Sequence, residues 1–333
     1  MDYQWYPGHM TKARRMMEEN IGLVDLVIEL TDARIPVSSR NPDIDKLSAN
    51  KARILVMTKA DLADPVRTAA FQKHFEDKGW MVVAVDARTR KSNDKIRAYV
   101  EKACSAKRER DKRRGIVGRP LRAMVVGIPN VGKSTFINSF AGKASAKTGN
   151  KPGVTRGKQW IRLNKNLELL DTPGILWPRF EDRQVGINLA LTGAIRQELL
   201  EEQELSLELL DFLQKEYPSL LVAKYAPKRE SEEETDPATE SPAEGQSYPV
   251  AKSAAEGRWQ LPMDSAELLT KIAEARKLIR TGGEPDYQRA SKMILDDFRN
   301  GRIGRITLET PPAESAETKA ADAKDVPSGG KRK

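Results

Sequence analysis

A chain of 333 residues with 39% hydrophobic and 32% charged side chains can fill two domains, and none of its apolar runs approaches the ~20 residues of a membrane-spanning helix. The N-terminus shows no secretory signal, and the single cysteine, Cys104, excludes an intrachain disulfide, so we expect a cytoplasmic protein. The net charge of +9 favours RNA or DNA as a partner, although a basic protein without such a partner would have the same composition.

The first half of the chain is expected to form an α/β fold with a mostly parallel sheet. Apolar, β-branched runs of strand length lie at residues 24–30, 53–57, 80–85 and 121–126, and helical or polar segments separate them. Two further short runs, at residues 158–163 and 167–170, flank a polar turn and are expected to pair as a hairpin. The pattern therefore predicts a six-stranded sheet that is complete before residue 175.

The stretch Gly127-Ile-Pro-Asn-Val-Gly-Lys-Ser134 lies between a predicted strand and a predicted helix and matches the phosphate-binding loop, G-x-x-x-x-G-K-[ST]. In such a loop backbone N–H groups surround a phosphate chain, and the helix N-terminus adds partial positive charge. Lys133 is expected to reach the terminal phosphates, and Ser134 is expected to ligate Mg²⁺. The predicted phosphate-binding residues of the loop are Pro129, Asn130, Val131, Gly132, Lys133, Ser134 and Thr135.

Two elements downstream of this loop indicate a nucleoside triphosphate switch. Asp171-Thr-Pro-Gly174 follows an apolar strand, so Asp171 could hold Mg²⁺ through water and the Gly174 N–H could meet a γ-phosphate. Between the two motifs, the Thr155 hydroxyl in the segment 151–156 could close on Mg²⁺ when a γ-phosphate is present. Thr155 and Gly174 therefore join the predicted phosphate site, and Ser134, Thr155 and Asp171 form the predicted magnesium site.

The predicted base-reading residues precede the phosphate loop in the chain. A guanine reader combines a lysine that stacks on the base with an aspartate that accepts from its N1–H and N2–H, and adenine cannot satisfy that carboxylate. Thr58-Lys-Ala-Asp61 follows one predicted strand, and Asp86-Ala87 follows the next and could offer an N–H to the guanine oxygen. Two strand ends with suitable chemistry, both upstream of the phosphate loop, favour a circularly permuted motif order.

The second half is expected to be helical at residues 183–216 and 264–300. Asp264 with Glu267 resembles a helix-starting cap, and Leu268, Ile272, Ala275 and Ile279 are expected to line one helix face that ends at Gly282-Gly283. Residues 225–260 are rich in Glu, Ser and Pro and are expected to be a flexible insertion, and residues 311–333 a disordered tail. We expect domains at 1–180 and 181–310.

These motifs together resemble the circularly permuted GTPases of the YlqF type. The resemblance covers most of the chain outside the insertion and the tail. It rests on Trp5-Tyr-Pro-Gly-His-Met10, Lys12-Ala-Arg-Arg15, Asp32-Ala-Arg-Ile-Pro36, the TKAD, GIPNVGKST and DTPG motifs, Pro152-Gly-Val-Thr-Arg156, and the C-terminal segment 298–308. The resemblance implies GTP hydrolysis coupled to late assembly of the large ribosomal subunit, stimulation of hydrolysis by that subunit, and a C-terminal helical domain that contacts rRNA. We expect no DNA partner, and we expect a monomer when the protein is off the ribosome.

The resemblance also assigns roles to individual residues. The family carries a hydrophobic residue after the DxxG motif, here Ile175, in place of a water-positioning glutamine, which implies slow hydrolysis until a partner completes the site. His9 is a proposed substitute for that glutamine, so the expected catalytic residues are His9, Lys133 and Gly174. Asn130 stands where related GTPases bind K⁺. Thr58 departs from the usual NKxD asparagine, which is expected to weaken nucleotide affinity while Asp61 keeps the preference for guanine.

Other interpretations stay open at this point. A small-molecule kinase could use the same phosphate loop, but it gives TKAD, Thr155 and DTPG no common purpose. The chain could also be a nucleotide-regulated nucleic-acid-binding module with weak or no physiological hydrolysis, since residues 264–280 and 286–300 could form a helix-turn-helix. Its basic residues Arg299, Arg302 and Arg305 lie at the end of the second helix, which suits contacts to a nucleic-acid backbone. The basic run at residues 107–122 is either a solvated linker or an rRNA-contacting segment.

Overall fold

The computed structural model describes residues 8–116, 118–142, 159–174, 176, 182–195, 201–227 and 259–312. Its described part contains a six-stranded sheet with the strand order β3-β2-β1-β4-β6-β5. The strands are β1 (Leu26–Asp32), β2 (Ala52–Thr58), β3 (Val82–Ala84), β4 (Leu121–Gly127), β5 (Gln159–Asn164) and β6 (Leu167–Asp171). All neighbours run parallel except β5, which pairs antiparallel with β6 across the turn at residues 164–166. The expected α/β class, strand number and hairpin are confirmed.

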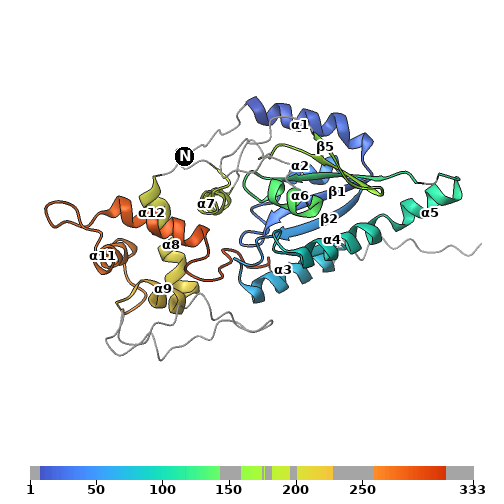
Figure 1. Ribbon diagram of the computed structural model, residues 1–333. Helices are drawn as coiled ribbons and strands as arrows, with labels where there is room; N and C mark the ends of the chain where they lie inside the picture. Colours follow the sequence, from blue (N-terminus) through green and yellow to red (C-terminus); the bar gives the residue numbers. More distant parts are fainter. Residues whose placement is uncertain are drawn as a thin grey trace, which may run out of the picture.

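Helices cover both faces of this sheet, which explains why β1 is buried along its whole length. On one face, α1 (Gly8–Asn20), α2 (Pro42–Leu47) and α3 (Pro65–Asp77) pack on side chains such as Val27, Leu55 and Met124. On the other, α4 (Arg90–Ala103) and α6 (Lys133–Ala141) pack on Ile28, Ile54 and Val125 with their neighbours. Helix α5 (Ser105–Arg113) extends beyond the sheet at the opposite end of the molecule from the helical region (Figure 1).

The helices after the sheet form a second packed unit beside the first (Figure 1). They are α7 (Arg183–Leu191), α8 (Glu202–Glu216), α9 (Pro218–Tyr225), α11 (Ser265–Ala275) and α12 (Tyr287–Arg299). Helix α8 packs against the other four, through residues such as Leu209, Leu213 and Ile294. None of the described helices has the length and apolar character needed to cross a bilayer.

The sequence correctly predicts how α11 begins but not how it ends. Asp264 caps the helix by accepting hydrogen bonds from the N–H groups of Ala266 and Glu267. The helix stops at Ala275, because Lys277 adopts a left-handed backbone (φ 54°), and Ala275 and Ile279 are therefore exposed instead of lining the core. The glycines at 282 and 283 lie in a later turn, which an isolated bridge between Ile279 and Pro285 closes.

Most of the expected insertion, residues 228–258, and the tail beyond residue 312 lie outside the described residues. The chain between them does not end in the helical unit. After α12, residues 301–309 return to the first unit and form backbone hydrogen bonds there, from Ile306 N to Leu62 O (3.0 Å) and from Leu308 N to Arg34 O (2.8 Å). The C-terminal part of the described chain therefore contributes to both units: α12 packs in the helical unit, and residues 301–309 bind the first unit.

Candidate nucleotide-binding site

The carboxyl ends of the parallel strands meet at one edge of the sheet, where open α/β folds bind ligands. Strand β4 ends in the predicted phosphate loop, and α6 begins at Lys133, directly after it. Within the loop, Asn130 (φ 57°) and Gly132 (φ 99°) are left-handed, a conformation that turns successive N–H groups inward and forms an anion-binding concavity. Ser134 is half-buried and Thr135 is exposed at the start of α6.

Lys133 is folded back into the phosphate loop. Its Nζ donates hydrogen bonds to the carbonyl oxygens of Gly127 (3.0 Å) and Ile128 (2.7 Å). Burial lowers the pKa of the Lys133 ammonium to about 8, although the nearby Asp171 carboxylate opposes this shift. A phosphate bound in the loop would form an ion pair with this ammonium.

Residues suited to Mg²⁺ lie beside Lys133. Asp171 is buried at the end of β6, where it pairs in register with Val125 of β4, and Ser134 follows Lys133 on α6. Hydroxyl and carboxylate oxygens are the donors that Mg²⁺ prefers, and its remaining ligands are commonly water and nucleotide phosphate. The described residues contain no group of three or more His, Cys, Asp or Glu that could hold a metal ion.

The DTPG segment turns back onto the phosphate loop. Thr172 Oγ1 donates to Val125 O (2.7 Å), which ties the segment to β4. A Cβ atom at Gly174 would lie 2.7 Å from the backbone nitrogen of Pro129 and 2.9 Å from Lys133 Nζ, so only glycine permits this approach. Gly174 is therefore beside the loop and the lysine with which it was predicted to act.

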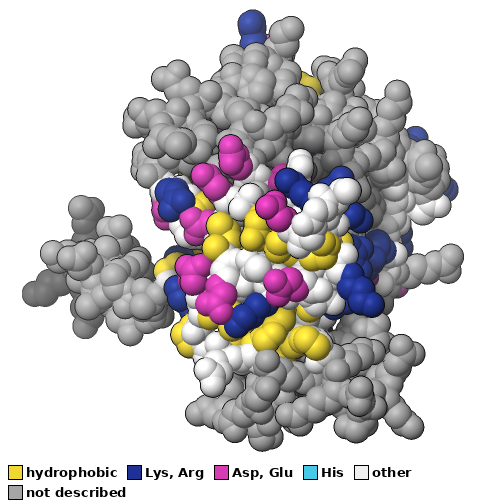
Figure 2. Space-filling model, turned by 90° about the vertical axis from the view of Figure 1, so that its left-hand side faces the viewer, with side chains coloured by type: hydrophobic (Ala, Val, Ile, Leu, Met, Phe, Trp, Pro, Cys, Tyr) yellow, Lys and Arg dark blue, Asp and Glu magenta, His cyan; other side chains and the backbone are white. Residues whose placement is uncertain are grey.

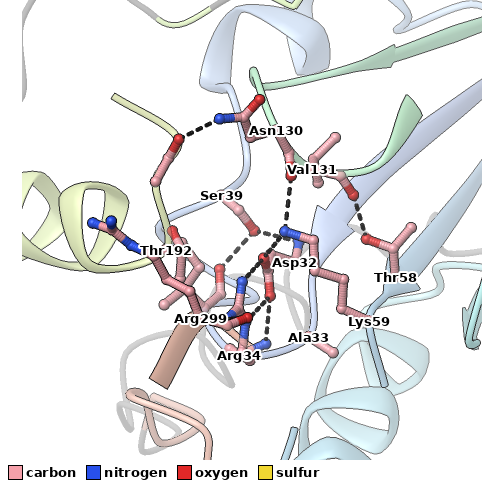
Figure 3. A network of polar contacts seen from close by, with 12 residues as sticks. Asp32, Ala33, Arg34, Ser39, Thr58, Lys59, Asn130, Val131, Thr192 and Arg299 are labelled. Carbon is pink, nitrogen blue, oxygen red and sulfur yellow. Dashed lines mark hydrogen bonds and ion pairs between the residues drawn. The ribbon is translucent and has the colours of Figure 1, made fainter. Parts of the chain in front are cut away.

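The predicted base-reading segment is hydrogen-bonded to the phosphate loop (Figure 3). The Thr58 hydroxyl oxygen lies 2.6 Å from Val131 O and 2.9 Å from Thr31 O. The next residue, Lys59, is left-handed (φ 55°), and its Nζ donates to Asn130 O (2.8 Å) and to Asp32 Oδ2 (2.8 Å). Thr58, the last residue of β2, and Lys59 directly after it thus bind two consecutive carbonyl groups of the phosphate loop.

Behind Lys59 lies a buried ion pair between Asp32 and Arg34, whose guanidinium donates to both carboxylate oxygens (3.0 and 2.8 Å). Burial alone would raise the pKa of the Asp32 carboxyl, but Arg34 and Lys59 outweigh it and hold that pKa well below its usual range. For Lys59, burial is the larger influence and lowers the pKa in spite of Asp32. The sequence contained Asp32 and Arg34 only as parts of a family motif, without a role.

Asp61 and Asp86 lie at neighbouring strand ends, as predicted, with the buried Ala87 between Asp86 and Arg88. An arginine that sequence reasoning missed joins them: Arg88 Nη2 lies 2.5 Å from Asp61 Oδ2, and its Nε lies 2.9 Å from Asp86 Oδ1. Burial and the neighbouring Asp86 raise the pKa of Asp61, whereas hydrogen bonds from Arg88 lower that of Asp86. Arg88 follows Asp86 by only two residues, and this short spacing could have indicated from the sequence that the two side chains interact.

The phosphate loop also contacts the helical unit. Asn130 Nδ2 donates to Gly193 O (2.5 Å), just after α7. Arg34 lies over the ring of Phe298 on α12 (5.3 Å to the ring centroid), and Arg299 donates to the carbonyls of Ala190 and Leu191 (both 2.9 Å). Arg299 is thus engaged within the protein, which speaks against the backbone contacts that the alternative of a nucleic-acid-binding module gave it.

Three predicted residues have no described side chain. His9 lies in α1, but the structure describes only its backbone, whereas Thr155 and Ile175 fall outside the described residues. The residues that the structure does bring to the carboxyl edge of the sheet or beside it are Thr58, Lys59, Asp61, Asp86, Ala87, Pro129, Asn130, Val131, Gly132, Lys133, Ser134, Thr135, Asp171 and Gly174.

The family model described as "50S ribosome-binding GTPase" matches residues 122–235, from the phosphate-loop strand onward. Ribosome biogenesis GTPase A of Bacillus cereus is 41% identical over 311 residues, which span 93% of this chain and 95% of the relative. The chain belongs to the ribosome biogenesis GTPase A family. It is accordingly an enzyme that hydrolyses GTP, and a guanine nucleotide with Mg²⁺ fits the donors described above.

A more distant relative and two solved structures are also similar to this chain. Mitochondrial ribosome-associated GTPase 1 of Mus musculus is 32% identical over 92% of this chain and 90% of its own length. The GDP-bound and GNP-bound structures of Thermotoga maritima YlqF, at 23% and 24% identity, superpose with TM-scores of 0.58 and 0.56. They cover 89% and 90% of this chain, each with 98% of the solved chain, and so show the same fold.

Proposed function

We propose that this GTPase binds rRNA on a precursor of the large ribosomal subunit, promotes late maturation of that subunit, and hydrolyses GTP faster when bound to it. The observation that carries the proposal is the Asn130–Gly193 hydrogen bond. It joins the phosphate loop, whose surroundings change on hydrolysis, to a unit that could contact a large partner. The names of the relatives, which refer to the ribosome and its biogenesis, supply the identity of that partner.

Helix α5 is the part of the described surface that best suits RNA. Arg110, Arg113 and Arg114 are spaced so as to share one face of this helix, all three are exposed, and Arg113 keeps 82% of its side chain accessible. Exposed cations on one helix face attract phosphates and release counterions on binding. This arrangement favours the rRNA-contacting interpretation of the basic run at residues 107–122 over the solvated linker.

The outer end of the helical unit has a different character. Figure 2 shows acidic, basic and apolar side chains mixed across the described part of this end. The segment from residue 276 to residue 286 between α11 and α12 is longer than the short turn of a helix-turn-helix, and Glu284 and Asp286 lie at the start of α12. These features speak against DNA reading by this helix pair.

A competition assay tests the RNA proposal. Large subunits or rRNA should displace a labelled rRNA fragment far better than random duplex DNA at the same salt concentration. Reversal of two charges on α5, Arg113→Glu with Arg114→Glu, should weaken binding and make the salt slope shallower by about 1–2. The matched control reverses Lys215, which is exposed, and Lys271, which is half-buried, both on the helical unit. Equal effects of both pairs would reject α5 as a specific contact.

Further roles belong to the same proposal. We propose that Thr155 and Asp171 complete the Mg²⁺ site with Ser134, that His9 assists the attacking water, and that Asn130 binds K⁺ through Oδ1, since K⁺ takes oxygen ligands. A K⁺ ion there would neutralise phosphate charge in place of an arginine finger. The cytoplasm stays the expected compartment, on the basis of the single cysteine, Cys104, which is buried and whose pKa burial raises to about 11.

A further inference from the structure

The segment at residues 301–309, here called the C-terminal strap, crosses from the end of α12 to the loop that carries Asp61. Arg305 donates from Nε to Ala63 O (2.8 Å) and from Nη2 to Ala60 O (2.9 Å), and Ile306 N donates to Leu62 O (3.0 Å). Three backbone carbonyls on either side of Asp61 are therefore held by two consecutive residues of the strap. The contact is close, since a Cβ atom at Gly301 would lie 2.7 Å from Leu62 Cδ2.

The strap continues along the same side of the nucleotide-binding unit. Thr307 is fully buried, and its Oγ1 accepts from Asp64 N (3.0 Å), the residue that caps α3. Glu309 then accepts from the N–H groups of Val37 (2.7 Å) and Ser38 (2.9 Å), shortly after the Asp32–Arg34 pair. The strap therefore forms hydrogen bonds with two segments of the first unit. One carries Asp61, and the other follows the Asp32–Arg34 pair that holds Lys59.

Arg305 does not act on the nucleotide by a direct charge contact, because both of the donors described above point at carbonyl groups of the protein. Arg302, three residues earlier, instead bonds Asp297 at the end of α12 through Nε, and half of its side chain is exposed. The two arginines therefore have the same charge and nearly the same place in the chain, but only Arg305 crosses to the base-reading loop.

We propose that Arg305 is a positioning residue for guanine recognition: through Ala60 and Ala63 it fixes the loop that aims the Asp61 carboxylate at the base. The proposal rests on the proposed role of Asp61 as guanine reader. It predicts that the end of the helical unit determines both the nucleotide affinity and the base selectivity of the GTPase. A partner that moved α12 away from the first unit would then loosen the hold on the base.

The test compares the affinities of GDP and IDP, because inosine lacks the exocyclic 2-amino group that Asp61 would bind. Arg305→Ala should weaken GDP binding by about tenfold, the change that 1.4 kcal/mol produces, while IDP binding falls much less. The GDP preference would therefore shrink. A general loss of structure would weaken both nucleotides alike and leave their ratio unchanged, and that result would overturn the proposal.

Three further variants make the outcome decisive. Arg302→Ala should keep the wild-type affinities, and a matching loss there would also overturn the proposal. Thr307→Val, which preserves volume but removes the acceptor for Asp64 N, should shrink the GDP preference in the same direction if Arg305→Ala fails to fold. Asp61→Asn should shift the nucleotide preference toward XDP. If it does not, Asp61 is not the guanine reader. If it does, but Arg305→Ala binds both nucleotides as the wild type does, only the role of the strap is rejected.

Discussion

Thr58 Oγ1 lies 2.6 Å from the carbonyl oxygen of Val131, so the segment expected to read the base and the loop expected to hold the phosphates are joined by one hydroxyl. The same oxygen lies 2.9 Å from Thr31 O on the neighbouring strand. Thr58 is fully buried, and its single hydroxyl proton is shared between these two carbonyl groups, of which Val131 O is the nearer. A threonine at this position thus retains a link between the two halves of a nucleotide site.

Replacement of Thr58 by valine should weaken this link. The volume is kept but a buried acceptor loses its donor, which costs about 1–3 kcal/mol. We expect the free energy of unfolding to fall by that amount in denaturant titrations, and a fluorescent GDP analogue to dissociate faster. Thr58→Ser keeps the hydroxyl and should stay close to wild type; if serine and valine behaved alike, the hydrogen bond would not be the cause.

The buried Asp32–Arg34 pair makes a prediction about pH. Because the folded-state pKa of Asp32 lies below its unfolded value of about 3.9, the pair stabilises the protein fully above that value and less as pH falls toward the folded pKa. Asp32→Asn should lower stability by about 3–5 kcal/mol at neutral pH, since it leaves buried cations without their partner.

The same variant should lose part of the acid dependence below about pH 5, which urea titrations at several pH values would measure. Asp94→Asn is the control, because Asp94 is 77% exposed and its ion pair, with Arg97, lies on the surface. A stability curve of Asp32→Asn that runs parallel to wild type down to low pH would contradict the assigned ion pair.

Lys133 links nucleotide binding to protons. Its pKa in the nucleotide-free protein is about 8, and a bound phosphate chain would raise it, so the complex holds the proton more tightly than the free protein. Between about pH 7.5 and 8.5, GDP binding should therefore take up protons and weaken as pH rises. Calorimetry in buffers of different ionisation enthalpy measures this uptake.

The control for this prediction is Lys133→Arg, whose guanidinium stays protonated throughout the range. Any GDP binding that remains in this variant should occur without proton uptake. Equal uptake by the lysine and arginine proteins would assign the proton to another group.

The close approach of Gly174 to Pro129 predicts a steric effect. A methyl group at residue 174 would lie 2.7 Å from the Pro129 nitrogen, which cannot yield without moving the phosphate loop. Gly174→Ala should lower GTP hydrolysis at saturating nucleotide by about tenfold or more, if it costs at least ~1.4 kcal/mol in the transition state. Gly22→Ala is the matched control, since nothing lies within 4 Å of the added atom there; equal losses in both variants would contradict the steric account.

The sequence predicted those parts of the site that depend on local patterns. The phosphate loop, Asp171 and the base-reading segment each follow an apolar run, and parallel strands bring their carboxyl ends to one edge without further information. The same logic predicted the six strands and the capping role of Asp264. The expected domain boundaries and the roles of His9 and Thr155 stay predictions.

What the sequence could not show is which backbone groups distant side chains would bind. Arg305 and Ala60 are 245 positions apart. In the alternative of a nucleic-acid-binding module, the place of Arg299, Arg302 and Arg305 at the end of the second helix suited them to contacts with a nucleic-acid backbone. Arg299 and Arg305 instead bind carbonyl groups of the protein itself. The error at Ile279 has a related cause: apolar spacing continued past Ala275, although the backbone leaves the helix at that residue.

Single-turnover hydrolysis tests the central claim most directly, measured in K⁺ and in Na⁺, with and without large ribosomal subunits, with ATP as the control nucleotide. We predict slow GTP hydrolysis by the free protein, of the order of 10⁻⁴ to 10⁻³ s⁻¹, strong stimulation by subunits, and a requirement for K⁺. ATP should not be hydrolysed under any of these conditions. A rate that subunits leave unchanged would contradict the proposed role in subunit maturation, and equal rates in the two salts would reject Asn130 as a K⁺ ligand.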